Sequence, residues 1–546
     1  MSVGTPILQR AACAAFFFFC AGAAAQFSAP EAESERVERR AAYAKRFMVA
    51  AADPRAVDAG LQMLRAGGSA ADAAIAAQLV LGLVEPQSSG LGGGAFALTW
   101  TEKERRVRSY DGRETAPAAA KPDRFVDRHG NPEQFMAAVM SGRSVGVPGV
   151  PRLLELLHRE HGRLPWARLF EPAIRLAQKG FTKTRRLARL LEREPQMRPF
   201  FAGARIVNPE YAATLRELAH EGAGAFYRGP IAADIVRAVD ADLALADLAA
   251  YRVIERDPVC GQYRGQRICG MGPPSSGAIG VLQILGILEH TAFDRAAPGS
   301  AQAVHLFSEA SRLAYADRAL YVGDPDFAPV PVARMLDRKY LAARAMRIGE
   351  RSMGYAVPGT LDPETPGTSH LSVVDADGNA VAMTTSIEMA FGSRILVRGF
   401  LLNNQLTDFS FRPEFLGRPA VNHVESGKRP RSSMAPTFVF ERDGRFKMAL
   451  GSPGGLVIIN YVAKVLVVAL DWGMDIQSAI SLPNFGSTNG PTFLERGTEV
   501  EALDDALAER GHVLNFPRLT SGLHGIERVP GGWRGGADPR REGIAA

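Results

Sequence analysis

A threonine that directly follows a glycine is the first feature of the chain that could do chemistry. Gly367-Thr368 ends a segment, 349–367, that is rich in Pro, Gly and acidic residues and reads as a linker or exposed loop. A threonine hydroxyl is a poor nucleophile unless a base adjoins it, and the α-amine of an N-terminal threonine can be that base because its pKa is about 7.7–8.0. Thr368 would gain this amine only by cleavage after Gly367. Most Gly-Thr pairs that follow a loop are structural, so the surroundings must decide.

Two segments of alternating polarity flank Asp377-Gly378 and predict a β-hairpin that begins at Thr368. A two-residue turn would set Thr368 opposite Ile387. A three-residue loop, with Gly378 in the left-handed position, would set it opposite Ser386. The second register sorts the side chains better, and register tends to follow such sorting. It collects Leu371, Met383, Val373 and Val381 on an apolar face, and Thr368, Ser386, His370, Thr384, Ser372 and Glu388 on the other.

Three further polar segments follow the hairpin, at 402–410, 428–434 and 451–455. The last, Gly451-Ser-Pro-Gly-Gly455, follows a strand and opens an apolar helix over 456–470. Backbone amides at such a helix start can stabilise an anion.

Two familiar motifs fail on their context. Residues 90–95 match the dinucleotide fingerprint G-x-G-x-x-G/A, but here a helix precedes the glycines and a strand follows them, the reverse of what that fingerprint needs. Residues 142–146 match the G-x-S-x-G nucleophile elbow around Ser144. The segment Val147-Pro-Gly-Val-Pro151 intervenes where a helix should start at once, so a structural turn is the better interpretation.

Helices and strands alternate along the rest of the chain. A helix pair is expected over 54–84, a strand over 95–100, mostly helices over 151–249 and strands over 252–272. Helices over 278–290 and 301–320 follow, then short strands and two more helices. This order favours helices packed on sheets, in an α/β or α+β arrangement.

In these segments the chain resembles the γ-glutamyltransferase (γ-glutamyl transpeptidase) family, whose members are threonine-type N-terminal-nucleophile hydrolases. The likeness covers nearly the whole mature chain and rests on segments 51–53, 85–94, 111–117, 273–277 and 537–540 as well as on the hairpin. It implies an α+β fold, a four-layer αββα sandwich. It also implies a precursor that cuts itself between Gly367 and Thr368 into a large subunit, 26–367, and a small subunit, 368–546, with no cofactor and no metal.

The resemblance also implies a role for each matching residue. Thr368 matches the nucleophile, Ser386 the supporting hydroxyl, which is normally Thr, and Gly454 and Gly455 the oxyanion-hole glycines. The groups that hold the glutamyl α-carboxylate correspond to Arg113, Ser432 and Ser433, and those near the α-ammonium to Gln405 and Asp408.

Glu388 departs from the pattern, because the family usually has Asn there. We expect it to add a second negative group for the ammonium; the alternative is that it turns away and pairs with Arg394 or another arginine. The segment between Asp408 and Ser432 is short for a full active-site lid, which implies a more open site.

Composition and charge exclude several classes of protein. With 46% hydrophobic and 22% charged residues, the chain is globular rather than disordered, collagenous or coiled-coil. A net charge of +6 over 546 residues, without a dense Lys/Arg block, argues against nucleic-acid binding. Residues 1–25 read as a signal peptide, with Arg10, an apolar run and Ala23-Ala-Ala25, so the mature protein should be periplasmic or secreted and have no membrane span.

Cys260 and Cys269 remain after the signal peptide is removed. A two-residue turn at Arg264-Gly265 would bring them opposite one another in a non-hydrogen-bonded pair, where side chains come closest. In an oxidising compartment a disulfide is plausible, and two buried free thiols are the alternative. The spacing does not suit a zinc site.

Three functions compete. The leading one is a γ-glutamyl hydrolase/transferase that acts on glutathione and related compounds, with water, an amino acid or a peptide as acceptor. The second is an acylase of the same fold for glutaryl or cephalosporin side chains. The third is a non-catalytic exported solute-binding protein, which the signal peptide, size and glycine-rich loops would also suit. The sequence leaves the acceptor, the balance of hydrolysis against transfer, and the oligomeric state open.

Overall fold

The computed structural model describes residues 36–357, 367–415 and 417–546. The predicted signal peptide, residues 1–25, lies outside the described residues, as do residues 358–366 directly before Gly367. Among the described residues, no helix is both long and apolar enough to cross a membrane.

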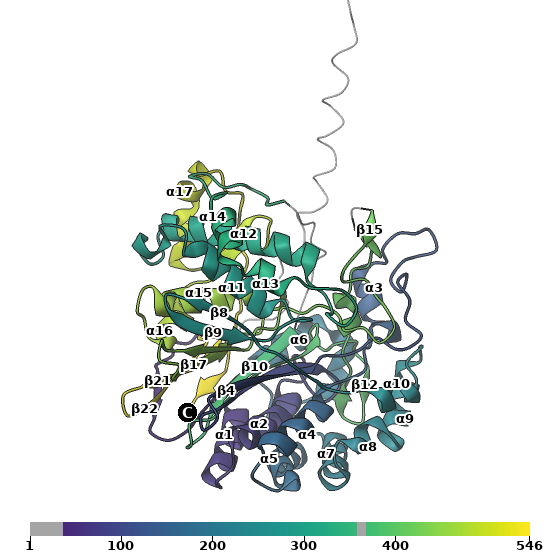
Figure 1. The fold of residues 1–546 in the computed structure, drawn as a ribbon. Coiled ribbons are helices and arrows are strands. Elements are labelled where there is room, and N and C mark those ends of the chain that lie inside the picture. The colour runs from purple at the N-terminus through teal and green to yellow at the C-terminus, as the bar shows by residue number, and fades with distance from the viewer. Residues whose placement is uncertain (1–35, 358–366, 416) are drawn as a thin grey trace, which may run out of the picture.

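Two antiparallel seven-stranded sheets lie face to face in the middle of the molecule (Figure 1). The first sheet has the strand order β23 (Ile544–Ala545), β2 (Met48–Ala51), β10 (Gly367–Val374), β11 (Ala380–Glu388), β3 (Gly94–Thr101), β4 (Arg106–Gly112) and β7 (Ile254–Arg256). The order in the second sheet is β1 (Ala42–Ala44), β22 (Gly532–Ala537), β21 (His524–Val529), β17 (Phe446–Gly451), β16 (Thr437–Phe440), β9 (Gln266–Gly270) and β8 (Val259–Tyr263).

Each sheet is covered on its outer face by a layer of helices (Figure 1). The first sheet packs against α1 (Pro54–Arg65), α2 (Ala70–Val84), α4 (Val150–His161), α5 (Trp166–Lys179), α7 (Pro209–Glu221), α8 (Gly224–Tyr227) and α9 (Pro230–Val239). The second packs against α11 (Gly277–Leu288), α12 (Ala301–Tyr321), α14 (Arg338–Ala345), α15 (Ile458–Leu470), α16 (Ile476–Ser481) and α17 (Asp504–Glu509). The predicted four-layer αββα sandwich is confirmed.

Shorter elements connect these layers. They are α3 (Phe135–Val139), α6 (Arg185–Arg193), α10 (Leu245–Ala250), α13 (Val332–Met335) and the strands β5 (Phe181–Thr182), β6 (Arg205–Ile206), β12 (Leu396–Val397), β13 (Phe400–Leu401), β14 (Glu414–Phe415), β15 (Arg418–Pro419), β18 (Phe485–Ser487), β19 (Thr492–Leu494) and β20 (Leu514–Asn515).

The helix pair α1–α2 shows how local sequence fixes these boundaries. Asp53 caps α1 by accepting the Arg55 amide, and Pro54 occupies the first turn, where its missing N–H costs nothing. Ser69 caps α2 in a capping box with Asp72. Every residue of α2 is buried, because one side packs on α1 and α5 and the other on β10 and β11.

Part of the expected linker is well anchored. The Met353 amide donates to the Glu309 carboxylate at 2.9 Å, and Ala356 exchanges two hydrogen bonds with the Asn489 side chain, at 2.7 and 2.9 Å. Residues 349–357 are largely exposed, as expected of a loop, but hydrogen bonds with distant side chains, which composition does not reveal, tie them to the rest of the molecule.

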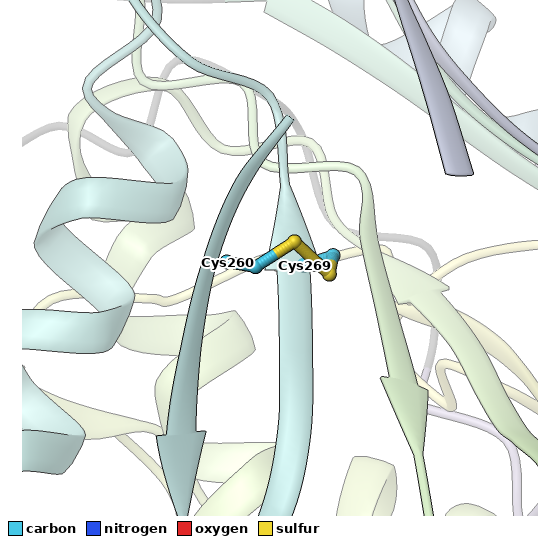
Figure 2. The surroundings of a disulfide bond; sticks show 2 residues. All are labelled: Cys260 and Cys269. Carbon is cyan, nitrogen blue, oxygen red and sulfur yellow. A yellow bond between two sulfur atoms is a disulfide. The ribbon is translucent and has the colours of Figure 1, made fainter. Parts of the chain in front are cut away.

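The predicted hairpin of the two cysteines is confirmed. Cys260 pairs with Cys269 across β8 and β9, the Cα atoms lie 4.1 Å apart, and the sulfurs form a disulfide (Figure 2). Arg264 and Gly265 at the turn both have positive φ, of 50° and 79°, as a type I′ turn requires.

We predict that exported protein carries this disulfide. Because it closes a short loop, replacing both cysteines by serine should lower the free energy of unfolding by at most about 2–3 kcal/mol. Intact-mass measurement after denaturation and alkylation should show two alkylated cysteines only when a reductant is present. Two alkylated thiols without reductant would contradict the prediction.

Candidate active site

Thr368 and Ser386 lie side by side at the start of β10 and the end of β11. They are direct partners in the strand register, and the Thr368 Oγ1 is 3.4 Å from the Ser386 Oγ. Both side chains are buried. The register follows from the loop, where Gly378 has a φ of 84° and the Asp375 carboxylate accepts the amides of Asp377 and Asn379. The three-residue loop predicted from the sequence is therefore confirmed.

The polar face of this hairpin points between the two sheets, and the apolar face packs under the helices. Leu371, Val373, Val381 and Met383 all belong to the core shared with α1 and α2. On the opposite face His370 bonds with Thr384 at 2.9 Å and Ser372 at 3.1 Å. Burial holds the pKa of His370 well below its usual range, so the ring is neutral.

The ladder between β10 and β11 is irregular at the predicted cleavage point. Gly367 pairs with Glu388 while Thr368 pairs with Ser386, so the register shifts between Gly367 and Thr368 and skips Ile387. Glu388 has a φ of 76°, a left-handed conformation that is uncommon for a residue with a side chain.

The glycine turn lies beyond the end of β17, which packs against β10. A Cβ at Gly451 would meet the His370 ring at 2.4 Å, so these two residues are in direct contact. Gly454 and Gly455 then take φ values of 126° and 54°, and the turn leads into α15. The Tyr461 ring leaves no room for a side chain at Gly454, because a Cβ there would lie 2.6 Å from it.

Arg113 lies at the centre of a buried polar cluster. Its Nη2 donates to the Asp408 carboxylate at 2.5 Å and to the Arg431 carbonyl at 3.0 Å, next to Ser432. Gln405 donates to the same Asp408 oxygen at 2.6 Å. Gln405 and Asp408 are brought together by the short helix Gln405–Asp408. The structure thus brings together Arg113, Gln405, Asp408 and the 431–433 segment, the residues that the family resemblance singled out.

Ser432 and Ser433 are both buried, and each hydroxyl oxygen accepts a hydrogen bond from the protein. The Ser432 Oγ accepts the Met434 amide at 3.1 Å, and the Ser433 Oγ accepts a hydrogen bond of 2.9 Å from Arg318 on α12.

Glu388 stays on the side of the nucleophile. Its amide donates to the Ser386 Oγ at 2.8 Å, and its carboxylate accepts a hydrogen bond from Asn404. Arg394, the suggested alternative partner, instead forms a two-pronged ion pair with Glu194 at 2.6 and 3.2 Å. The alternative that pairs Glu388 with Arg394 is therefore wrong.

Sequence reasoning missed several members of the site. Asn404 donates to the Glu388 carboxylate and orients it. The Glu114 carboxylate lies 3.8 Å from the Arg113 guanidinium. It also lies against Gly94, the strand partner of Ser386, where an added Cβ would be 2.3 Å from a Glu114 carboxylate oxygen. Burial raises the pKa of Glu114 to about 8. Both residues stand in segments already noted in the sequence, but only their burial sets them apart.

The rejected nucleophile elbow is a structural turn. Ser144 lies in the short helix Gly142–Ser144, is buried, and donates to the carbonyls of Val139 and Ser141 at 2.8 Å each. Residues 90–95 stand between helix α2 and strand β3, the reverse of a dinucleotide site.

One group of possible metal ligands comes together in the described part of the chain: His305, Glu309 and His512. His305 and His512 bond each other at 2.8 Å, and their outer nitrogens bond the Gly349 carbonyl at 2.9 Å and Thr492 at 2.7 Å. Burial lowers the pKa of His512 to about 4, so this ring is neutral. Its nitrogens are engaged in hydrogen bonds, which favours a structural role.

Comparison with known proteins agrees with this site. The sequence profile of the gamma-glutamyltranspeptidase family matches residues 56–546. The glutathione hydrolase proenzyme of Escherichia coli K12 is 36% identical over 533 residues, which cover 91% of each chain. The acylase ACY 1 proenzyme of Pseudomonas sp. SE83 is 35% identical over 527 residues, which cover 92% of this chain and 93% of the other.

Among solved structures, the cephalosporin acylase from Bacillus halodurans superposes with a TM-score of 0.83 at 29% identity, over 95% of this chain and 99% of its own. The profile match and the curated relatives lead to one conclusion: the chain belongs to the γ-glutamyltranspeptidase family.

Proposed function

We propose that the protein is a γ-glutamyl hydrolase/transferase that cleaves the γ-glutamyl bond of glutathione and related compounds through an ester on Thr368. The observation that carries the proposal is the Thr368–Ser386 hydroxyl pair, 3.4 Å apart and buried between the sheets, at the point where the ladder is irregular.

Maturation comes first. The Thr368 Oγ1 attacks the Gly367 carbonyl carbon, and the acyl group moves from the Thr368 nitrogen to Oγ1, which leaves an ester and a free amine that takes up the hydroxyl proton. Water then hydrolyses the ester and releases the carboxylate of 26–367 and the Thr368 hydroxyl. Gly367 has no side chain to obstruct the attack. Relatives whose names describe proenzymes support such a step.

Catalysis then uses the new terminus. The Thr368 amine takes the hydroxyl proton as Oγ1 attacks the γ-carbonyl, and the amides of the 454–455 turn stabilise the oxyanion. Collapse expels the amine of the donor, which takes the proton from Thr368. Water or an acceptor amine then attacks the ester and regenerates the free hydroxyl.

Donor recognition rests on paired charges. Arg113, Ser432 and Ser433 present donors to the α-carboxylate, and Asp408 and Glu388 offer negative charge to the α-ammonium. A glutaryl group lacks the ammonium. An acylase is the second candidate because of the Bacillus halodurans and Pseudomonas relatives. The two buried carboxylates favour the γ-glutamyl donor: Arg113 supplies one cation beside Asp408, and the donor's ammonium would supply a second, which lowers the cost of burying both ionised groups.

We also propose that the protein is exported, by cleavage of residues 1–25, and that subunits 26–367 and 368–546 remain associated in the periplasm or outside the cell. The signal-like start of the sequence supports this.

Replacing Thr368 by Ala should leave a single uncut chain without activity, because the hydroxyl that attacks Gly367 is gone. Denaturing gels and N-terminal sequencing of the smaller fragment measure the outcome. The matched control is Ser144→Ala, which removes the hydroxyl of the rejected motif and should mature normally. If Thr368→Ala still splits at the same bond, Thr368 is not the processing nucleophile.

Replacing Asp408 by Asn should lower kcat/KM for γ-glutamyl anilide by more than about tenfold, because a desolvated charge pair loses one partner. Glu388→Gln should lower it less and leave glutaryl anilide turnover unchanged or improved. The control Asp326→Asn removes an exposed acid from the ion pair with Arg256 and should change neither donor. A wild-type enzyme that hydrolyses both anilides equally well would show that the pocket does not read the ammonium.

A further inference from the structure

Arg318 is a buried arginine that contacts the 431–433 segment at Ser433, two residues after the Arg431 carbonyl that Arg113 contacts. It lies near the C-terminal end of α12 and is 2% exposed. Its Nη2 donates to the Ser433 Oγ at 2.9 Å, and its Nε donates to the Ser276 Oγ at 2.7 Å. One guanidinium thus binds two serines that are far apart in the sequence.

Ser276 in turn holds the neighbouring Ser432. Its hydroxyl and its amide both donate to the Ser432 carbonyl, at 2.6 and 2.8 Å. The Ser275 hydroxyl donates to the Met434 carbonyl at 2.6 Å, and the Ser432 amide donates to the Pro274 carbonyl at 3.1 Å. The turn 273–277 therefore lies against the 432–434 segment along its length.

These contacts dictate the direction of two hydroxyl protons. An arginine can only donate, so Ser276 and Ser433 must each use a lone pair to accept from Arg318. Ser276 directs its own proton to the Ser432 carbonyl. The Ser433 proton likewise cannot point at the guanidinium and must be donated elsewhere. A hydroxyl that accepts from a cation is polarised and becomes a stronger donor to an anion.

The same helix also reaches the oxyanion turn. Tyr315, one turn before Arg318, donates its hydroxyl to the Leu456 carbonyl, directly after Gly455, and accepts from Asn460 at 3.1 Å. Residues three apart on a helix share a face. α12 is thus a common support for both places that a donor would touch: the glycine turn and the 432–433 serines.

We propose that Arg318 is a positioning residue for the donor's α-carboxylate. It acts through Ser433 and, by way of Ser276, through Ser432. It orients the Ser433 hydroxyl, holds the Ser432 backbone in place through Ser276, and strengthens the Ser433 hydrogen bond to the ligand by its charge. The inference rests on the proposed function, because it takes the carboxylate of a γ-glutamyl donor as the ligand of these serines.

The test compares donors that differ by one charged group: γ-glutamyl anilide and 4-aminobutyryl anilide, which lacks the α-carboxylate. Anilide release with mature enzyme in excess gives kcat/KM even for a poor donor. Arg318→Gln should raise KM for the γ-glutamyl donor by about tenfold or more while kcat changes little, since one charge-assisted hydrogen bond is lost. Its kcat/KM for the 4-aminobutyryl donor should stay within about twofold of wild type.

Further variants keep the test decisive. Arg318→Lys should recover part of the loss, and Ser276→Ala should give a smaller loss with the same selectivity for the carboxylate. If Arg318→Gln does not mature, these two are compared in its place. The control is Arg344→Gln, another buried arginine, which donates to the Leu313 carbonyl and pairs with Asp317 but touches neither serine.

The outcomes separate the two proposals. If wild type does not distinguish the two donors, the pocket does not read the carboxylate and the proposed function fails. If wild type distinguishes the two donors but the Arg318 variants lose the same fraction of kcat/KM with both donors, or behave like Arg344→Gln, Arg318 has only a structural role and the inference is overturned.

Discussion

The pairing of β10 with β11 is the constraint on which the site depends. Because side chains alternate along a strand, a shift of one residue would turn Thr368 toward the helices and bury Leu371 between the sheets. The three-residue loop at Gly378 and the apolar face under α1 and α2 together exclude that shift. The hydroxyl pair is thereby fixed by packing that takes no part in the chemistry.

A polar face buried between two sheets is stable only if its polar groups form hydrogen bonds or ion pairs. The site meets this condition with bonds across large sequence distances. Arg113 and Asp408 are 295 residues apart, and Arg318 and Ser433 are 115 apart. Removing one partner of such a pair leaves a buried group without compensation, which typically costs several kcal/mol. The network that holds the donor site is thus also part of what holds the two sheets together.

The sequence predicted what local rules govern. The register of Thr368 against Ser386, the turn that pairs Cys260 with Cys269, and the helix pair α1–α2 each depend on a few adjacent residues. The site residues and the four layers came from a family resemblance, which carries long-range information that spacing lacks. Neither the local rules nor the resemblance predicted the residues that hold the site residues and the 349–357 segment in place. Asn404 beneath Glu388, Arg318 behind Ser433 and the anchoring of 349–357 by Glu309 and Asn489 depend on contacts between distant segments.

The sheet order explains how a chain could be cut at its nucleophile and keep its site. In the first sheet β10 lies between β2, from 26–367, and β11, from 368–546, and in the second sheet β16 pairs with β9. Each sheet contains strands from both sides of the cut that are hydrogen-bonded to one another, so breaking one peptide bond leaves the ladders intact. β10 pairs with β11 from Gly367 onward, with the register shift before Thr368, but with β2 only from Leu371 onward. Ser369 is held at the same end by Glu85, at 3.1 Å. A new terminus at Thr368 would therefore stay in register with Ser386, because the ladder with β11 and the Ser369–Glu85 hydrogen bond do not depend on the peptide bond that is cut.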